Sequence, residues 1–193
     1  SADSPISWYE NDGSESFTPH SIITSISAAQ RVYAADMDGD GDMDLVVASG
    51  NTDNKINWYE NNGSQSFTEY TITTSVASPL SMHVIDMDKD GDMDVLSASM
   101  QDNKIAWYEN NGSQAFTAHS VSTSADFAMG VHAVDVDADG DLDILSASYE
   151  DDKIAWYENP TDNAALVNYS NGSTTTKLTF NYTVAAGENS SDL

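Results

Sequence analysis

Residues 36–44 read Asp-Met-Asp-Gly-Asp-Gly-Asp-Met-Asp. The same alternation of aspartates, with glycine at the sixth position, returns at residues 86–94 and 135–143. These three windows hold fifteen of the 32 acidic side chains, in a chain of 193 residues that has 6 basic ones and a net charge of -26. Five carboxylates so close together repel one another strongly unless a cation lies among them. The charge pattern therefore predicts metal sites rather than a solvated acidic tail.

Calcium suits such a window best, because it takes six to eight hard oxygen ligands from carboxylates, backbone carbonyls and water. We expect positions one, three, five and nine to supply a carboxylate oxygen, position seven its backbone carbonyl, and the glycine at position six to permit a sharp turn. Magnesium prefers fewer protein ligands and a stricter octahedron, and zinc prefers His or Cys. The sequence thus predicts about three Ca2+ ions, one per window. Their predicted ligands are Asp36, Asp38, Asp40, Asp42, Asp44, Asp86, Asp88, Asp90, Asp92, Asp94, Asp135, Asp137, Asp139, Asp141 and Asp143.

An EF-hand or dockerin loop begins in the same way, but it needs an acidic residue at the twelfth position and flanking helices. Here the twelfth positions are Val47, Ser97 and Ser146, and each falls in a segment that reads as a strand. The sequence therefore excludes a helix–loop–helix calcium site.

A second repeated phrase keeps the same period as the aspartate windows. Trp8, Trp58, Trp107 and Trp156 recur at spacings of 50, 49 and 49, in the phrases ISWYEN, KINWYEN, KIAWYEN and KIAWYEN. A period near 50 residues is typical of propeller blades and other β arrays. Because the tryptophans keep such a regular phase, we expect them to pack between repeats rather than to stack on sugars.

One period contains four predicted strands and no helical pattern. In the middle repeat these are 82–86, which runs into the aspartate window, then 94–99, 104–109, and a fourth that begins at Phe116. An Asp-Gly or Asn-Gly pair follows the third strand at residues 12–13, 62–63 and 111–112, and such pairs favour a type I′ hairpin turn with φ > 0 at both positions. The fold class is therefore all-β, built from tandem four-stranded antiparallel blades of a β-propeller.

The aspartate windows and the four-stranded period together resemble the FG-GAP/VCBS repeats of integrin α-subunit propellers and of many secreted bacterial proteins. The resemblance covers residues 6–159 and rests on three copies of the nine-residue motif in register. It implies a calcium-binding propeller at the cell surface or in the extracellular space. Propellers of this family usually have seven blades, whereas the sequence shows about three and a partial one.

The predicted domain organisation follows from these repeats. A partial blade covers 6–23, and blades follow at about 31–74, 81–123 and 130–159. Residues 160–193 read as a linker plus one strand, Leu178 to Val184. This strand is the missing fourth strand of the last blade, a connector, or the start of a neighbouring domain. Since rings typically have four to eight blades, we expect self-association or the rest of a larger chain to complete the array.

Several classes of function are disfavoured. A strongly acidic surface repels nucleic acid and anionic membranes, and no apolar run is long enough to span a bilayer. The four histidines recur in phase with the repeats, as packing residues do, and no nucleophile motif, phosphate loop or His metal cluster accompanies them. We therefore expect no enzyme.

Residues 1–4 lack the features of a signal peptide. Six N-x-[ST] sequons matter only in a glycosylating host; they begin at Asn62, Asn111, Asn168, Asn171, Asn181 and Asn189.

Three functional hypotheses remain from the sequence. The first is a secreted or cell-surface module for adhesion or ligand binding, with a glycan or protein as ligand. The second is a structural subunit that assembles head-to-tail into a ring or filament through blade edges. The third is a non-catalytic fragment of a polysaccharide-degrading enzyme.

Overall fold

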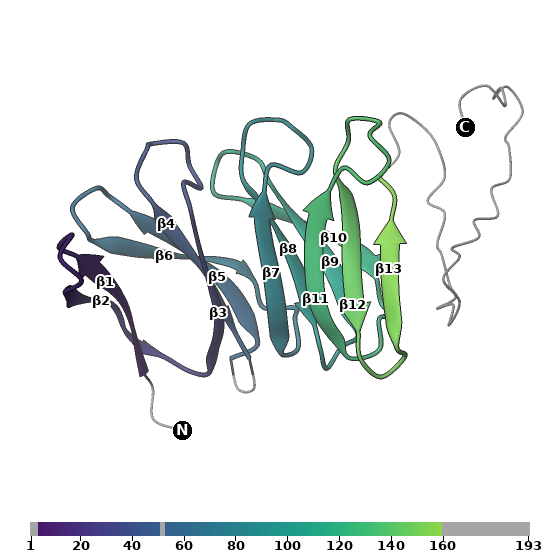
Figure 1. Ribbon diagram of the computed structural model, residues 1–193, viewed down its shortest axis with the longest axis horizontal. Coiled ribbons are helices and arrows are strands. Elements are labelled where there is room, and N and C mark those ends of the chain that lie inside the picture. Colours follow the sequence, from purple (N-terminus) through teal and green to yellow (C-terminus); the bar gives the residue numbers. More distant parts are fainter. Residues whose placement is uncertain (1–3, 51–52, 160–193) are drawn as a thin grey trace, which may run out of the picture.

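The computed structural model describes residues 4–50 and 53–159, with the side chains of residues 4, 5, 24 and 25 left out. In these residues it contains β-strands and no helix, so no helix that could span a membrane is found there. The strands form separate sheets that stand side by side along the molecule (Figure 1). The predicted all-β class is confirmed.

Two complete four-stranded antiparallel sheets occupy the centre, and we call them blades 1 and 2. Blade 1 has the order β3-β4-β5-β6, with the bounds Ala29–Ala35, Asp44–Ser49, Lys55–Asn61 and Phe67–Thr73. Blade 2 has the order β7-β8-β9-β10, with the bounds Pro79–Ile85, Asp94–Ser99, Lys104–Asn110 and Phe116–Ser122. Four strands per repeat are what the sequence predicts.

Two partial sheets flank the complete blades. A hairpin of β1 (Ser4–Asn11) and β2 (Phe17–Ile26) precedes blade 1. Blade 3 contains β11 (Ala128–Val134), β12 (Asp143–Ser148) and β13 (Lys153–Tyr157) among the described residues. The predicted strand at Leu178 to Val184 and the predicted linker lie outside the described residues. The blades form an array that the described residues do not close into a ring (Figure 1).

The second strand of each blade is the most buried, because it lies between two strands of its own sheet; in blades 1 and 2 it also lies between two neighbouring sheets. Every residue of β8 is buried, and its sequence Asp-Val-Leu-Ser-Ala-Ser is apolar or small after the first position. Such short unbroken runs are typical of strands that are covered on both faces. This strand therefore fixes the end of the aspartate loop that precedes it.

Apolar side chains between adjacent blades form the core. Blade 1 contributes Val46, Ile56 and Trp58 to a cluster that also contains Val95 and Tyr108 of blade 2. A second cluster joins blades 2 and 3, and a third joins blade 1 to the β1–β2 hairpin. Each blade therefore buries its faces against its neighbours, as expected of repeat proteins.

The hairpin turns between the third and fourth strands differ from the predicted type I′ geometry. In blade 1 the positive φ angles fall at Gly63 (72°) and Gln65 (61°), and not at Asn62. The Asn62 side-chain oxygen instead accepts hydrogen bonds from the N–H groups of Ser64 (3.0 Å) and Ser66 (3.3 Å). The prediction was wrong because the asparagine side chain closes a longer loop by bonding to the backbone that follows it.

Candidate metal centre

Each aspartate loop joins the first strand of a blade to the second: β3 to β4, β7 to β8, and β11 to β12. The glycine at position six has a left-handed backbone in all three loops, with φ between 93° and 103° at Gly41, Gly91 and Gly140. Since a residue with a Cβ adopts this conformation only at a cost, glycine permits the turn here as predicted.

Hydrogen bonds within each loop turn the carboxylates inward. In the first loop, Asp36 accepts hydrogen bonds from the N–H groups of Gly39 (2.8 Å) and Gly41 (3.0 Å). The carboxylate of Asp40 accepts one from the N–H of Asp42 at 2.8 Å. In the third loop Asp135 accepts from Ala138 and Gly140, and in the second Asp86 accepts from Gly91. The three loops therefore share one backbone design, although their fourth residues are Gly, Lys and Ala.

Three carboxylates of each loop converge. In every loop, one oxygen from each of three aspartates lies within 4.8 Å of the other two. These groups are Asp36, Asp38 and Asp40; Asp86, Asp88 and Asp90; and Asp135, Asp137 and Asp143. Calcium–oxygen distances of 2.3–2.6 Å allow two ligands on one ion to be about 5 Å apart, so each group fits a single calcium ion.

A buried oxygen in the second loop supports the same conclusion. Asp86 Oδ1 is buried, and no hydrogen-bond donor of the described residues contacts it. Its counterparts in the other two loops accept a hydrogen bond from the residue at position four. Because burying a carboxylate oxygen without a partner is costly, this atom is suited to bind a cation.

Burial raises the pKa of several loop carboxyls. Desolvation is the main cause at Asp38, Asp88 and Asp137, and neighbouring carboxylates add to it. The effect is largest at Asp94, where desolvation outweighs the hydrogen bonds from Asn110 and Met87 and raises the pKa to about 6. The ionised loops are thus electrostatically unfavourable by themselves, and a divalent cation would relieve the repulsion.

The ninth aspartate has a structural role that the sequence did not reveal. Asp44 is fully buried, and its Oδ2 accepts hydrogen bonds from the Met37 N–H (3.1 Å) and the Trp58 indole Nε1–H (3.0 Å). Its Oδ1 accepts one from the Asn61 N–H at 2.7 Å. These bonds tie the loop to β5. Asp94 and Asp143 repeat the backbone bonds at the equivalent positions.

The remaining predicted ligands do not belong to a convergent group. Asp44 and Asp94 do not belong to the convergent groups of their loops, and neither does Asp139 of the third loop. The side chain at position seven turns toward a neighbouring turn: Asp92 approaches Gly112, and Asp141 forms an ion pair with Lys89 at 3.2 Å. A ligand role for the backbone carbonyls of Asp42, Asp92 and Asp141 and for the other outlying carboxylates stays a prediction.

Where calcium binds, the convergent carboxylates would hold it, and the ion would neutralise their charge and cross-link the first and second strands of the blade. This cross-link joins two adjacent strands of one sheet. The donor set consists of carboxylate oxygens alone, which fits a hard cation and not a soft one. Nothing in this arrangement requires a further chemical role for the ion.

A glutamate that the sequence analysis did not single out belongs to the same surroundings. It follows the tryptophan by two residues in each phrase that comes after an aspartate window, at Glu60, Glu109 and Glu158. Burial raises the pKa of Glu158, and Asp137, Asp143 and Asp139 raise it further, so this side chain lies near its loop. Its recurrence in phase with the aspartate windows was the signal that could have revealed it.

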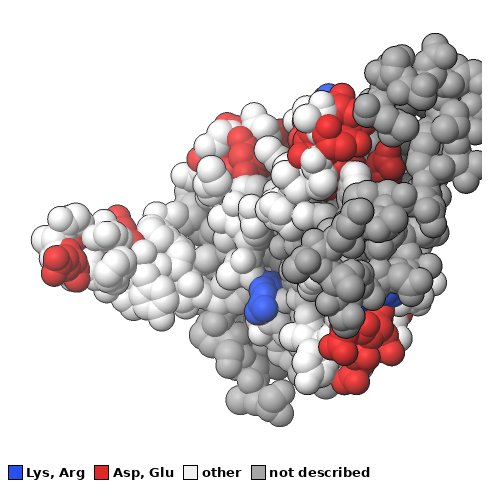
Figure 2. Space-filling model, turned by 45° about the vertical axis from the view of Figure 1, so that its right-hand side comes forward, with Lys and Arg blue, Asp and Glu red and all other residues white. Residues whose placement is uncertain are grey.

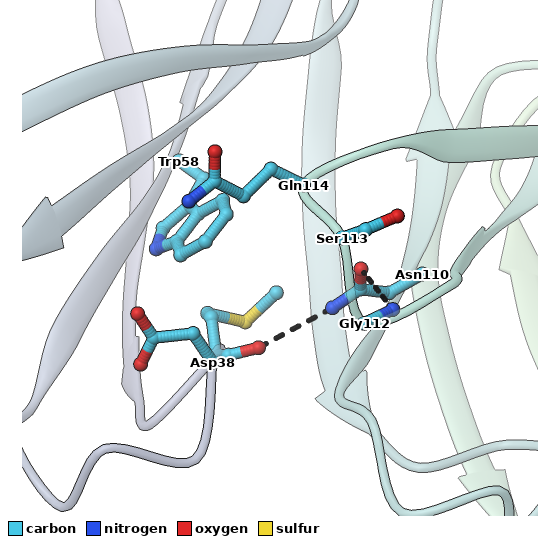
Figure 3. Close-up of a pocket in the computed structure, with 7 residues that line it drawn as sticks. Asp38, Trp58, Asn110, Gly112, Ser113 and Gln114 are labelled. Carbon is cyan, nitrogen blue, oxygen red and sulfur yellow. Dashed lines mark hydrogen bonds between the residues drawn. The ribbon is translucent and has the colours of Figure 1, made fainter.

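Blades 1 and 2 meet at a small cavity beside the first loop (Figure 3). It has a volume of about 120 Å³ and is lined by Asp38, Trp58, Asn110 and the turn after β9. Asn110 closes it by donating a hydrogen bond to the Met37 carbonyl at 3.3 Å. This volume is well below the several hundred Å³ of a typical ligand pocket. We therefore interpret it as a gap between the blades rather than as a ligand pocket.

The histidines take part in packing, as expected. His119 lies on the Trp107 ring, with centroids 4.5 Å apart, and its Nε2 contacts Glu109 at 2.6 Å. His20, with Trp8 and Glu10, repeats the arrangement, and Tyr70 beside Trp58 replaces it in blade 1. Trp58 is buried as predicted, with 1% of its surface exposed, whereas Trp107 is only partly buried.

Comparison with known protein families matches the FG-GAP-like repeat at residues 1–47, 39–97 and 86–146. These matches cover most of the chain, which therefore belongs to the FG-GAP-like repeat family. The second and third matches begin inside one aspartate loop and continue past the next, so the sequence repeat is offset from the structural blade. A search of curated proteins finds no match.

Membership of this family carries general expectations. FG-GAP repeats often bind Ca2+, are typically extracellular, and are typically non-catalytic. The convergent aspartates agree with the first of these properties. The acidic side chains also gather in separate patches on the surface, rather than covering it evenly (Figure 2).

Proposed function

We propose that this chain is a secreted or cell-surface β-propeller repeat module that calcium stabilises and that serves adhesion or ligand binding. The observation that carries the proposal is the convergence of three carboxylate oxygens within 4.8 Å in each of three equivalent loops. Extracellular calcium modules bind the ion at about 10⁻⁴–10⁻³ M, so a chain that depends on such sites for stability suits the calcium-rich space outside cells.

Calcium has a structural role in this proposal. Each ion neutralises an acidic loop and holds the first two strands of a blade together, and the blades then present their connecting loops to a ligand. The ligand is a glycan or a protein, since the net charge of -26 disfavours nucleic acid and anionic lipid. The cavity between blades 1 and 2 is too small to hold a large ligand, so the proposal places binding on the connecting loops and not in this cavity.

A glycan array and a panel of extracellular proteins, probed with the calcium-loaded chain, test the ligand-binding part. We expect specific binding that is lost when a chelator removes calcium and returns when calcium is restored. Failure of the folded, calcium-loaded protein to bind any glycan or protein would contradict adhesion or ligand binding, but not calcium binding.

A second candidate function, head-to-tail assembly, is favoured by one observation. Ile56 and Ile105 are fully buried at the contacts between blades, whereas the equivalent Ile154 of blade 3 is 72% exposed. The face of blade 3 that carries Ile154 therefore corresponds to the faces that neighbouring blades cover in blades 1 and 2. We propose a second copy of the chain as its occupant, through a heterologous contact. Light scattering in calcium tests this: oligomers that Ile154→Asp disperses are expected, and a monodisperse monomer would refute assembly.

A further inference from the structure

The contact between blades 2 and 3 includes a hydrogen bond to a histidine ring. His83 on β7 accepts a hydrogen bond at Nδ1 from the backbone N–H of Ala133 on β11, at 2.9 Å. Beside it, the Val131 N–H donates to the hydroxyl oxygen of Ser81 at 3.3 Å. β7 and β11 belong to different sheets, so these two bonds join the blades directly.

This bond requires a neutral imidazole. An imidazole nitrogen accepts a hydrogen bond only when it carries no proton, so the His83 proton must be on Nε2. Protonation at Nδ1 would point an N–H at the Ala133 N–H, which can only donate. The bond would be lost and the two donors would repel each other. No other backbone–side-chain bond between the blades depends on a group that titrates near neutral pH, among the described residues.

The groups around His83 do not stabilise the protonated form of its ring. The ring of His132, on β11, stacks on it with centroids 4.4 Å apart and planes at 17°, and Tyr33 on β3 meets its edge at 6.3 Å. β3 also carries Arg31, whose guanidinium donates to the carbonyl of Gln30. The acidic residues of β4 and β8 are Asp44 and Asp94, each at the loop end of its strand. Opposite His83 on β8 lies Leu96.

We propose that His83 makes the contact between blades 2 and 3 sensitive to acid: protonation at Nδ1 breaks its bond to Ala133 and loosens the two sheets from each other. A module of this kind would be rigid at neutral pH and less rigid in an acidic compartment or medium. The device is absent between blades 1 and 2, where Tyr33 occupies the equivalent position and its phenol ring has no nitrogen to accept such a bond.

The direction of the effect follows from linkage. Burial lowers the pKa of His83 below its ordinary value of 6.5, and His132 lowers it further. The unfolded or opened chain therefore binds a proton more readily than the closed one. The contact between blades 2 and 3 is most stable when the pH is above the ordinary histidine pKa of about 6.5. It becomes weaker as the pH falls from there toward the lowered pKa of His83 in the closed contact. For one proton the opening equilibrium changes by at most about tenfold per pH unit in this window.

NMR on the full chain in saturating calcium tests the proposal. At neutral pH the ¹⁵N shifts of His83 are expected to report the Nε2–H tautomer. As the pH falls, the exchange protection of the Ala133 amide, corrected for the intrinsic rate, is expected to decrease by up to about tenfold per pH unit, while amides within blade 1 keep theirs. His83→Asn offers an acceptor that does not titrate, so the Ala133 amide in this variant is expected to keep its protection.

His132→Asn is the matched control, because it removes the neighbouring charge and leaves the bond from Ala133. It is expected to retain the acid response and to shift it to higher pH. A proton on Nδ1 of His83 at neutral pH would overturn the proposal, and so would an equal loss of Ala133 protection in the wild-type chain and in His83→Asn. A fold check by circular dichroism at neutral pH accompanies each variant.

Discussion

The indole Nε1–H of Trp58 donates a hydrogen bond to Oδ2 of Asp44 at 3.0 Å, and both side chains are buried. The bond joins the last residue of the aspartate loop to the tryptophan of the repeated Trp-Tyr-Glu-Asn phrase. The two sequence signatures of the repeat are therefore parts of one local structure. The backbone N–H of the asparagine in the phrase donates to the last loop aspartate in all three blades, and the equal period of the two signatures reflects that shared contact.

Asp44→Ala tests whether the ninth aspartate is structural in its own right. The substitution leaves the N–H groups of Met37 and Asn61 and the Trp58 indole without their acceptor, and it should destabilise the fold by at least about 3 kcal/mol. The loss should occur both in calcium and in chelator, as measured by urea unfolding. Asp40→Ala is the control, because Asp40 belongs to the convergent group and should lower stability in calcium only. Equal behaviour of the two variants would contradict the distinction.

Trp58→Ala should remove a large side chain from the contact between blades 1 and 2. We expect a loss of about 3–5 kcal/mol, as for other large-to-small changes in a core. Trp58→Phe keeps most of the packing and loses the bond to Asp44, so a loss of about 1 kcal/mol is expected there. Chemical denaturation measures both. A Trp58→Ala variant as stable as the wild-type chain would show that this tryptophan is not part of the core.

Position three of the loop should matter more to calcium than position seven. Asp88 contributes an oxygen to its convergent group, whereas the side chain of Asp92 turns toward Gly112 and its predicted role uses the backbone carbonyl. Asp88→Ala should therefore weaken calcium binding far more than Asp92→Ala in isothermal titration calorimetry. If Asp92→Ala weakened binding as much or more, the ligand assignment would be incorrect.

Lowering the pH should increase the stability of the calcium-free protein and decrease the contribution of calcium to the stability of the loaded protein. Without calcium, burial raises the pKa of the loop carboxyls, to about 6 for Asp94, so the folded state binds more protons than the unfolded state. Stability is then gained as the pH falls through about 6 and is lost as it rises again. With calcium, protons compete with the ion and its contribution shrinks. The measurement uses the His83→Asn variant, because the pKa of His83 is lowered and its titration has the opposite effect on stability. In this variant the difference in melting temperature between calcium and chelator should become smaller as the pH falls from about 7.5 to 5.

The sequence predicted the parts of the fold that depend on local pattern. The bounds expected for the second and third strands of blade 2 agree with β8 and β9 within a residue, because alternation and the short apolar run are local properties. The loop glycine was also predictable, since the sharp turn needs a left-handed residue at Gly41. Lys89 and Ala138 adopt left-handed φ angles of 63° and 64° at position four, which their residue types do not suggest.

Contacts between distant residues account for what the sequence could not predict. The bonds of Asp44 to Trp58 and Asn61 link positions 14 and 17 residues apart, and nothing in the motif distinguishes this aspartate from its neighbours. The different burial of Trp58 and Trp107, at equivalent positions of their repeats, depends on what covers each blade. His83 and Ala133 meet only because blades 2 and 3 lie side by side.

Whether calcium stabilises the fold can be measured from the melting temperature of the full chain at neutral pH, first in excess calcium and then in excess chelator. An ion that binds only the folded state stabilises it by about 2.7 kcal/mol per site at a hundredfold excess over Kd, so three sites should raise the melting temperature markedly. Chelator should lower it, and added calcium should restore it. A melting curve that is the same in calcium and in chelator would contradict the proposal that these loops bind calcium and that the ion stabilises the fold.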